Sequence, residues 1–178
     1  MNIKKQFSTG KRFIKSTLPL MITIVSFSLL SAGLFAQANF SGSWAFNESK
    51  SALGEGPMMS ATSMTVTQTA DLISMDLVQP SFDGSGDMKR SEKYTLDGKE
   101  SVNVGMMNSS VKAITTWSAD KKELKFDKTT TFDMNGEKME MKSTENWKIS
   151  DDGKALSIKS VLSSPMGEMN VTLVYDKK

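Results

Sequence analysis

The residues best suited to bind another molecule lie in one short predicted strand, DMKRSEKYTL, at residues 87–96. Alternation along a strand places Arg90, Glu92 and Tyr94 on one face, beside apolar side chains. A guanidinium offers two aligned donors to an anionic or carbonyl group, and a tyrosine ring offers a flat apolar wall. The spacing therefore predicts a ligand contact on an inner face. Two alternatives are a β-bulge that turns Arg90 and Glu92 to solvent and a position at the barrel rim, where they would form a surface pair.

Other predicted strands also carry a polar residue on their apolar face. By alternation, each of these polar residues lies on the same face as the apolar side chains of its strand. They are Lys128, Glu145, Thr115 and Ser160. Inside a small barrel, such groups would share one interior and would have to pair, hydrate or bind a ligand. We expect the carboxylates to balance the cations and the rings to form apolar walls. The predicted ligand-binding set is Arg90, Glu92, Tyr94, Trp117, Lys128 and Glu145.

Several classes of chemistry are excluded by composition. The chain contains no histidine and no cysteine, which removes Ser-His-Asp and Cys-His catalysis and the common zinc, haem and iron–sulfur sites. No phosphate-binding glycine motif is present. The acidic stretch 83–87, DGSGD, is interpreted as a turn rather than a calcium loop. We expect no catalytic residue, no metal and no cofactor.

The elements that must position these residues are strands. Apolar and polar residues alternate in successive short runs from residue 60 onward, and Asp97-Gly98, Asn135-Gly136 and Asp152-Gly153 can close hairpins between them. This pattern predicts an all-β fold, a single antiparallel up-and-down β-barrel of about 8–10 strands. Closure into a barrel removes exposed edges. The alternating runs are 63–67, 73–77, 101–106 (with Val102 and Val104 on the apolar face), 124–127, 138–142, 156–159 and 169–175.

An export signal is predicted at residues 1–38. Five basic residues precede an apolar run, which ends at Ala36-Gln37-Ala38, and this order is typical of a secretory signal peptide. We predict cleavage after Ala38 and a secreted or periplasmic protein. The alternative is an uncleaved membrane anchor, because the apolar run is near the lower length limit for a membrane span.

The predicted mature domain, residues 39–178, is mildly acidic. Removing the five basic residues of the first 38 from the total of 22 leaves 17, against 20 acidic residues, a net charge of −3. This charge does not call for nucleic acid or an anionic membrane as a partner. We expect a monomer that touches the membrane only through the signal segment, with a small hydrophobic ligand as a possible partner.

The start of the predicted domain, Asn39-Phe40-Ser41-Gly42-Ser43-Trp44, carries the pattern F-x-G-x-W. It resembles the opening strand of the lipocalins and fatty-acid-binding proteins, the calycins. The resemblance implies a lipocalin-like barrel in which Gly42 allows a tight strand start and Trp44 plugs the closed end. The sequence departs from these families near its end. Leu173-Val174-Tyr175 lacks the ligand-gripping arginine of the fatty-acid-binding proteins. Lipocalins place a basic residue against the motif tryptophan, and Lys177 and Lys178 are poor substitutes for it.

Two functions of different classes follow. The first is non-catalytic binding or carriage of a small, mostly apolar ligand inside the exported barrel. The second is a structural or interaction module of the cell envelope with a filled core and no ligand. Some calycins are isomerases or hydrolases, but no constellation in this sequence supports an enzyme.

Overall fold

A computed structural model describes residues 36–178 except 55–59, 82–83, 135 and 165–166. The chain divides into two compact units, Met1–Gly33 and Leu34–Lys178, and only the second is described below. The predicted signal segment therefore lies almost wholly outside the described residues. Among the described residues, no helix has the length and apolar character needed to cross a membrane.

The described unit is a single antiparallel sheet of ten strands, which confirms the predicted all-β fold. Short 3₁₀ turns, η1 (Glu48–Lys50) and η2 (Met106–Asn108), interrupt two of the connections. The strands are β1 (Gly42–Phe46), β2 (Ser63–Gln68), β3 (Leu72–Pro80), β4 (Asp87–Thr95), β5 (Glu100–Val104), β6 (Ser110–Trp117), β7 (Glu123–Met134), β8 (Glu137–Ile149), β9 (Ala155–Ser164) and β10 (Gly167–Lys177).

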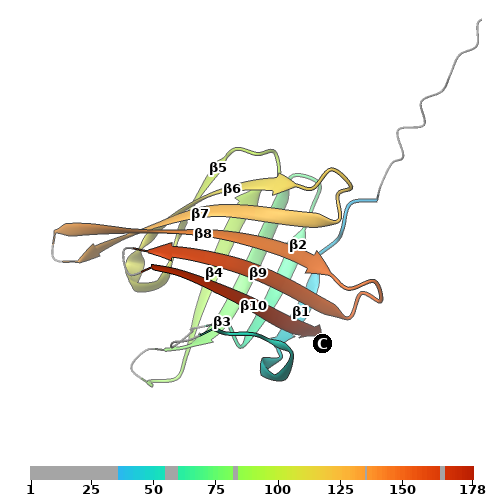
Figure 1. The fold of residues 1–178 in the computed structure, drawn as a ribbon, viewed down its shortest axis with the longest axis horizontal. Coiled ribbons are helices and arrows are strands. Elements are labelled where there is room, and N and C mark those ends of the chain that lie inside the picture. The colour runs from blue at the N-terminus through green and yellow to red at the C-terminus, as the bar shows by residue number, and fades with distance from the viewer. Residues whose placement is uncertain (1–35, 55–59, 82–83, 135, 165–166) are drawn as a thin grey trace, which may run out of the picture. The chain divides into compact units, whose positions relative to one another are not determined.

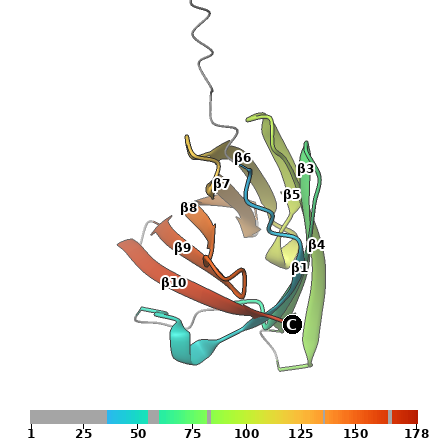
Figure 2. The ribbon, with the colours of Figure 1, turned by 90° about the vertical axis from the view of Figure 1, so that its right-hand side faces the viewer.

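The sheet curls into a nearly closed barrel. Its strand order is β4-β3-β2-β1-β10-β9-β8-β7-β6-β5, so the first and last strands of the chain pair in the middle of the sheet. There, Trp44 lies opposite Lys177 and Phe46 opposite Tyr175. Figures 1 and 2 show the two halves curving toward each other, with the paired ends of β7 and β8 reaching beyond the barrel wall.

The barrel has a seam where β4 and β5 meet, because these strands stand at opposite ends of the order. Side chains of β5 take over the role of a backbone ladder there. Asn103 accepts from the Lys93 amide through Oδ1 at 2.8 Å and donates Nδ2 to the Lys93 carbonyl at 2.9 Å. Ser101 Oγ accepts from the Thr95 amide at 3.0 Å. A side-chain amide paired with both backbone groups of one residue satisfies an edge that would otherwise be left open.

The seam also explains why β5 differs from the sequence expectation. Val102 and Val104 were expected on the inner, apolar face, but they are 63% and 62% exposed, while Ser101 is buried. The inner positions of β5 go to Ser101 and Asn103 because their polar atoms are needed to reach β4. Satisfying the edge hydrogen bonds thus outweighs burial of two valines.

The core fills one end of the barrel with aromatic rings. Phe40 stacks on Trp117 with ring centroids 5.9 Å apart and meets the edge of Trp147, also at 5.9 Å. Trp147 in turn packs against Phe126 at 5.1 Å. Burying each of these large side chains contributes roughly 1.5–3 kcal/mol, so this end of the barrel contributes substantially to stability.

The F-x-G-x-W segment closes the same end. Trp44 is fully buried, and its indole N–H donates to the Phe40 carbonyl at 3.0 Å. Lys177 Nζ lies 5.6 Å from the centroid of the Trp44 ring, so this lysine, expected to be a poor substitute, does lie against the tryptophan. Gly42 has a φ of 148°, and a Cβ there would lie 3.2 Å from Lys177 Cε. Glycine therefore suits both the backbone and the close approach of the lysine.

We predict that Asn103→Ala weakens the seam. Losing both hydrogen bonds to Lys93 should lower the free energy of unfolding by about 1–3 kcal/mol, measured by urea denaturation. Hydrogen exchange at the Lys93 amide should accelerate more than at other β4 amides. Asn170→Ala on β10 is the matched control, since the Asn170 side chain is exposed and its hydrogen bond to Glu168 is long, at 3.5 Å. Equal effects of the two substitutions would contradict a closing role for Asn103.

Candidate functional site

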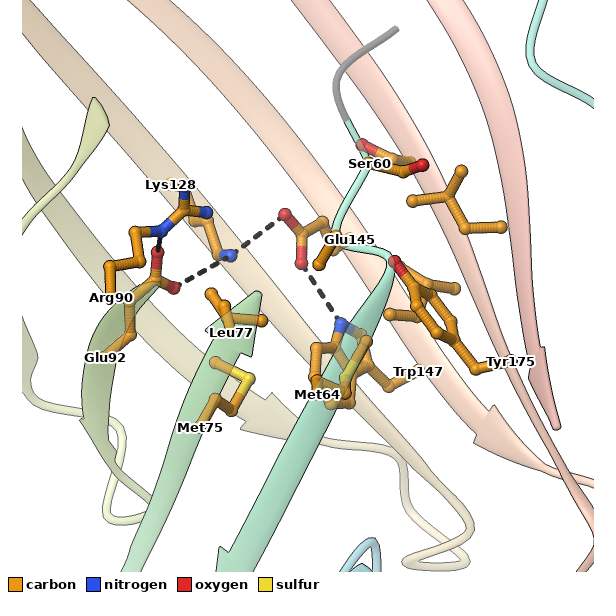
Figure 3. Close-up of a pocket in the computed structure, with 14 residues that line it drawn as sticks. Ser60, Met64, Met75, Leu77, Arg90, Glu92, Lys128, Glu145, Trp147 and Tyr175 are labelled. Carbon is orange, nitrogen blue, oxygen red and sulfur yellow. Dashed lines mark hydrogen bonds and ion pairs between the residues drawn. The ribbon is translucent and has the colours of Figure 1, made fainter. Parts of the chain in front are cut away.

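Three strands bring four charged side chains together inside the barrel. Arg90 and Glu92 project from β4, Lys128 from β7 and Glu145 from β8. Each occupies an inner position because strand alternation puts it on the same side as buried apolar neighbours. Strands β4 and β7 are far apart in the sheet order, but Glu92 of β4 and Lys128 of β7 point toward each other inside the barrel (Figure 3).

The four side chains form a continuous line of ion pairs, which we call the ion chain. Arg90 Nε lies 2.9 Å from Glu92 Oε1, and Lys128 Nζ lies 2.9 Å from Glu145 Oε1. The two pairs are joined by a longer contact of 4.0 Å between Lys128 Nζ and Glu92 Oε2. The chain therefore links β4 to β7 and β8 from within the barrel.

Neutral groups hold both carboxylates in place. Tyr94 Oη donates to Glu92 Oε2 at 2.7 Å, and Trp147 Nε1 donates to Glu145 Oε2 at 3.1 Å. Every carboxylate oxygen of the ion chain thus has a donor. Gln79 on β3 accepts a hydrogen bond from Arg90 Nη1, which orients the guanidinium.

Burial and charge act against each other in this site. Burial opposes ionisation of Glu92, yet Lys128, Arg90 and the hydrogen bonds from Tyr94 and Arg90 hold its pKa below the ordinary value of 4.5. Burial likewise opposes protonation of Lys128, but Glu145, Tyr94 and Glu92 raise its pKa above the ordinary value. Glu92 and Lys128 consequently carry their charges at neutral pH.

A cavity of about 170 Å³ borders the ion chain. Its walls combine apolar side chains with the charged groups and three hydroxyls (Figure 3). The lining residues are Ser60, Ala61, Met64, Met75, Leu77, Arg90, Glu92, Lys128, Glu145, Trp147, Ile158, Ser160, Leu173 and Tyr175.

Tyr175 is a candidate binding residue that the sequence did not single out, because it was only part of the alternating run 169–175. It is 2% exposed and lies across the cavity from Arg90 and Glu92 in Figure 3. Burial and the nearby Glu145 raise the pKa of its hydroxyl, so the group stays protonated. Within the described residues its hydroxyl makes no hydrogen bond, and because Tyr175 lines the cavity, this hydroxyl can donate to a molecule there. Alternation with Leu173 was a signal for its inward position.

Two residues of the predicted set lie away from the cavity. Tyr94 is fully buried against Phe126, with ring centroids 5.2 Å apart, and it reaches the site only through Glu92. Trp117 stacks on Phe40 in the aromatic core. Neither residue borders the cavity, because each lies closer to the closed end of the barrel than the ion chain does. Arg90, Glu92, Lys128 and Glu145 do border it.

No protein-family model matches the sequence, and no curated protein sequence matches it. Among solved structures, the chain is similar to the zebrafish ileal bile acid-binding protein complexed with cholic acid. The two share 16% sequence identity over 78% of this chain and 98% of that chain, with a TM-score of 0.49. This likeness is too low to indicate what the present chain binds, so the site is interpreted from its own side chains.

We predict that Lys128→Met destabilises the protein strongly. The substitution leaves Glu145 and part of Glu92 without their buried cation, a loss of about 3–5 kcal/mol. Lys125→Met is the matched control on the same strand, because its pair with Asp127 at 2.7 Å lies on the outer face with both side chains more than 40% exposed. That control should cost less than about 1 kcal/mol. Chemical denaturation measures both, and similar losses would show that the ion chain is not a buried network.

We predict that Glu92→Gln makes the free energy of unfolding depend less on pH in the acidic range. Since the pKa of Glu92 is lower in the folded chain than its ordinary value of 4.5, the unfolded chain takes up the proton first as the pH falls. The stabilisation from Glu92 is therefore present above about pH 5 and is lost through the more acidic range. Urea unfolding at pH values from 7 to 3 measures this. As the pH falls, the free energy of unfolding of the wild type should approach that of the variant.

The half-exposed Glu100, paired with Lys112 at 3.2 Å on the outer face, provides a control for this measurement. At pH 7, Glu100→Gln should lower the free energy of unfolding by less than about 1 kcal/mol, because an exposed ion pair contributes little. A Glu92→Gln profile parallel to wild type at all these pH values would contradict the coupling between Glu92 and its buried cations.

Proposed function

We propose that the protein binds a small, mostly apolar ligand inside its barrel without transforming it. The observation that carries this proposal is the cavity of about 170 Å³ between an apolar wall and the ion chain. Apolar surface with a few convergent polar groups is the usual make-up of a small-molecule site. The cavity lies below the ~300 Å³ at which sites for drug-sized ligands begin. The ligand, or the part of it that enters the barrel, is therefore small.

A non-catalytic role is supported by how the ionisable groups of the site are held. Both carboxylates are engaged by cations and by neutral donors. The lowered pKa of Glu92 also makes it a poor proton donor at neutral pH. With no histidine or cysteine in the sequence, these features favour binding over proton transfer or nucleophilic attack.

The second candidate is a structural or interaction module of the cell envelope. It is favoured by the aromatic core, in which Phe40, Phe126 and Trp147 already fill one end of the barrel. In that case the cavity would hold only water, which the hydroxyls of Ser160 and Tyr175 could bind. Detection of a bound organic molecule distinguishes the two candidates.

Export and calycin membership belong to the same proposal. The N-terminal pattern of residues 1–38 supports a secreted or periplasmic domain. The Trp44–Lys177 contact and the meander closed by β1 and β10 support a place among the calycins. Ala38 donates its amide to the Lys121 carbonyl at 2.9 Å, and Gln68 Nε2 donates to the Ala38 carbonyl at 2.9 Å. Cleavage after Ala38 would remove one partner of each bond, and N-terminal sequencing of the exported protein locates the cut.

We predict that Ser160→Leu abolishes ligand binding while the fold persists. The added isobutyl group on β9 points into the cavity and would take up much of its volume. Ser163→Leu, three residues along the same strand and exposed on the outer face, should bind as wild type does. Native mass spectrometry of each protein purified from its host compares the co-purifying mass. Circular dichroism checks the fold. Wild type without any bound molecule, or Ser160→Leu with a full complement, would contradict a ligand in this cavity.

A further inference from the structure

We propose that the ligand enters the site with an uncharged, oxygen-bearing polar group, such as an alcohol, ketone or amide, rather than with a carboxylate or an amine. This inference rests on the proposed binding function and specifies the ligand class. It is based on the charges that border the cavity and on the polar atoms there that still lack partners.

The charges around the cavity already cancel. Among the described lining residues, the cations Arg90 and Lys128 are matched by the anions Glu92 and Glu145. A carboxylate added to this interior would leave a net negative charge, and an ammonium group a net positive one. An uncompensated charge costs more where less water reaches it, and the side chains of Glu92 and Lys128 on this wall are only 6% and 12% exposed. A neutral ligand keeps the balance.

The existing anions cannot easily make way for a ligand carboxylate. The side chain of Glu92 is only 6% exposed and is held by Arg90, Tyr94 and, at longer range, Lys128. Releasing Arg90 to a ligand would strand this carboxylate in the interior. The same holds for an amine at Glu145, because Lys128, with a side chain only 12% exposed, would lose its 2.9 Å partner.

The groups that remain available suit a neutral oxygen. A guanidinium has five N–H donors, and Arg90 uses its Nε for Glu92 and one Nη1 hydrogen for Gln79. Its side chain is 29% exposed, the most accessible of the ion chain. On the far wall, the hydroxyls of Ser160 and Tyr175 make no hydrogen bond within the described residues. Together these groups can donate to a carbonyl or both donate to and accept from an alcohol.

Three six-carbon probes that differ only in their head groups test the inference at neutral pH. They are 1-hexanol, hexanoate and hexylammonium, titrated into isotopically labelled protein and followed by NMR. The indole N–H of Trp147 is the reporter, because Trp147 lines the cavity and donates to Glu145. We expect 1-hexanol to bind at least about tenfold more tightly than either ion, which corresponds to about 1.4 kcal/mol.

Two variants shift the charge balance in opposite directions. Glu145→Gln leaves the ion chain with a net charge of +1 and should move the preference toward hexanoate, whereas Arg90→Gln leaves −1 and should move it toward hexylammonium. If one variant fails to fold, the other still tests the rule. Glu123→Gln removes a charge from the outer face, where Glu123 pairs with Lys148 at 2.9 Å, and should keep the wild-type order.

The outcomes separate this inference from the function on which it rests. Hexanoate or hexylammonium as the tightest wild-type probe would overturn the neutral ligand but keep the binding function. An order of affinities unchanged in the folded Glu145→Gln or Arg90→Gln variant would also overturn the charge rule. A wild-type protein in which none of the three probes shifts the Trp147 signal would overturn ligand binding in this cavity, and the inference with it.

Discussion

Because burying an unpaired charge costs several kcal/mol, the charged side chains inside this barrel have to meet one another. Arg90 and Glu92 come from β4, an edge strand, while Lys128 and Glu145 come from β7 and β8. Their pairing draws the inner face of β4 toward the other half of the sheet. The ion chain is therefore both the polar wall of the candidate site and an internal clamp across the seam between β4 and β5.

The same arrangement sets how much room is left for a ligand. Tyr94 follows Glu92 by two residues on β4, and its hydroxyl donates to that carboxylate. Trp147 follows Glu145 by two residues on β8, and its indole N–H donates to that carboxylate. Both rings belong to the aromatic core. Those rings occupy the closed end, so only the space on the other side of the ion chain stays open. The size of the cavity and its charge balance thus have a common origin in the positions of the charged residues.

Much of the fold could be predicted from the alternation of apolar and polar residues, because alternation is a local property of each strand. It placed Arg90, Glu92, Lys128 and Glu145 on inner faces, where they lie. It was wrong for β5, since an edge strand at a seam uses its inner side chains for hydrogen bonding. It also could not show that Trp117 lies against Phe40, because alternation gives the face of a residue but not its height along the barrel.

By itself, the sequence determined the antiparallel strand architecture, the absence of histidine and cysteine chemistry, and the presence of charges at inner positions. Only the tertiary structure decided which charges pair, that Tyr175 lines the cavity, and that the cavity has a volume of about 170 Å³. The physical reason is that contacts between β4 and β7 depend on how the whole sheet curls and where it stays open. All ten strands together determine how the sheet closes, so the closure cannot be predicted from any single segment of the sequence.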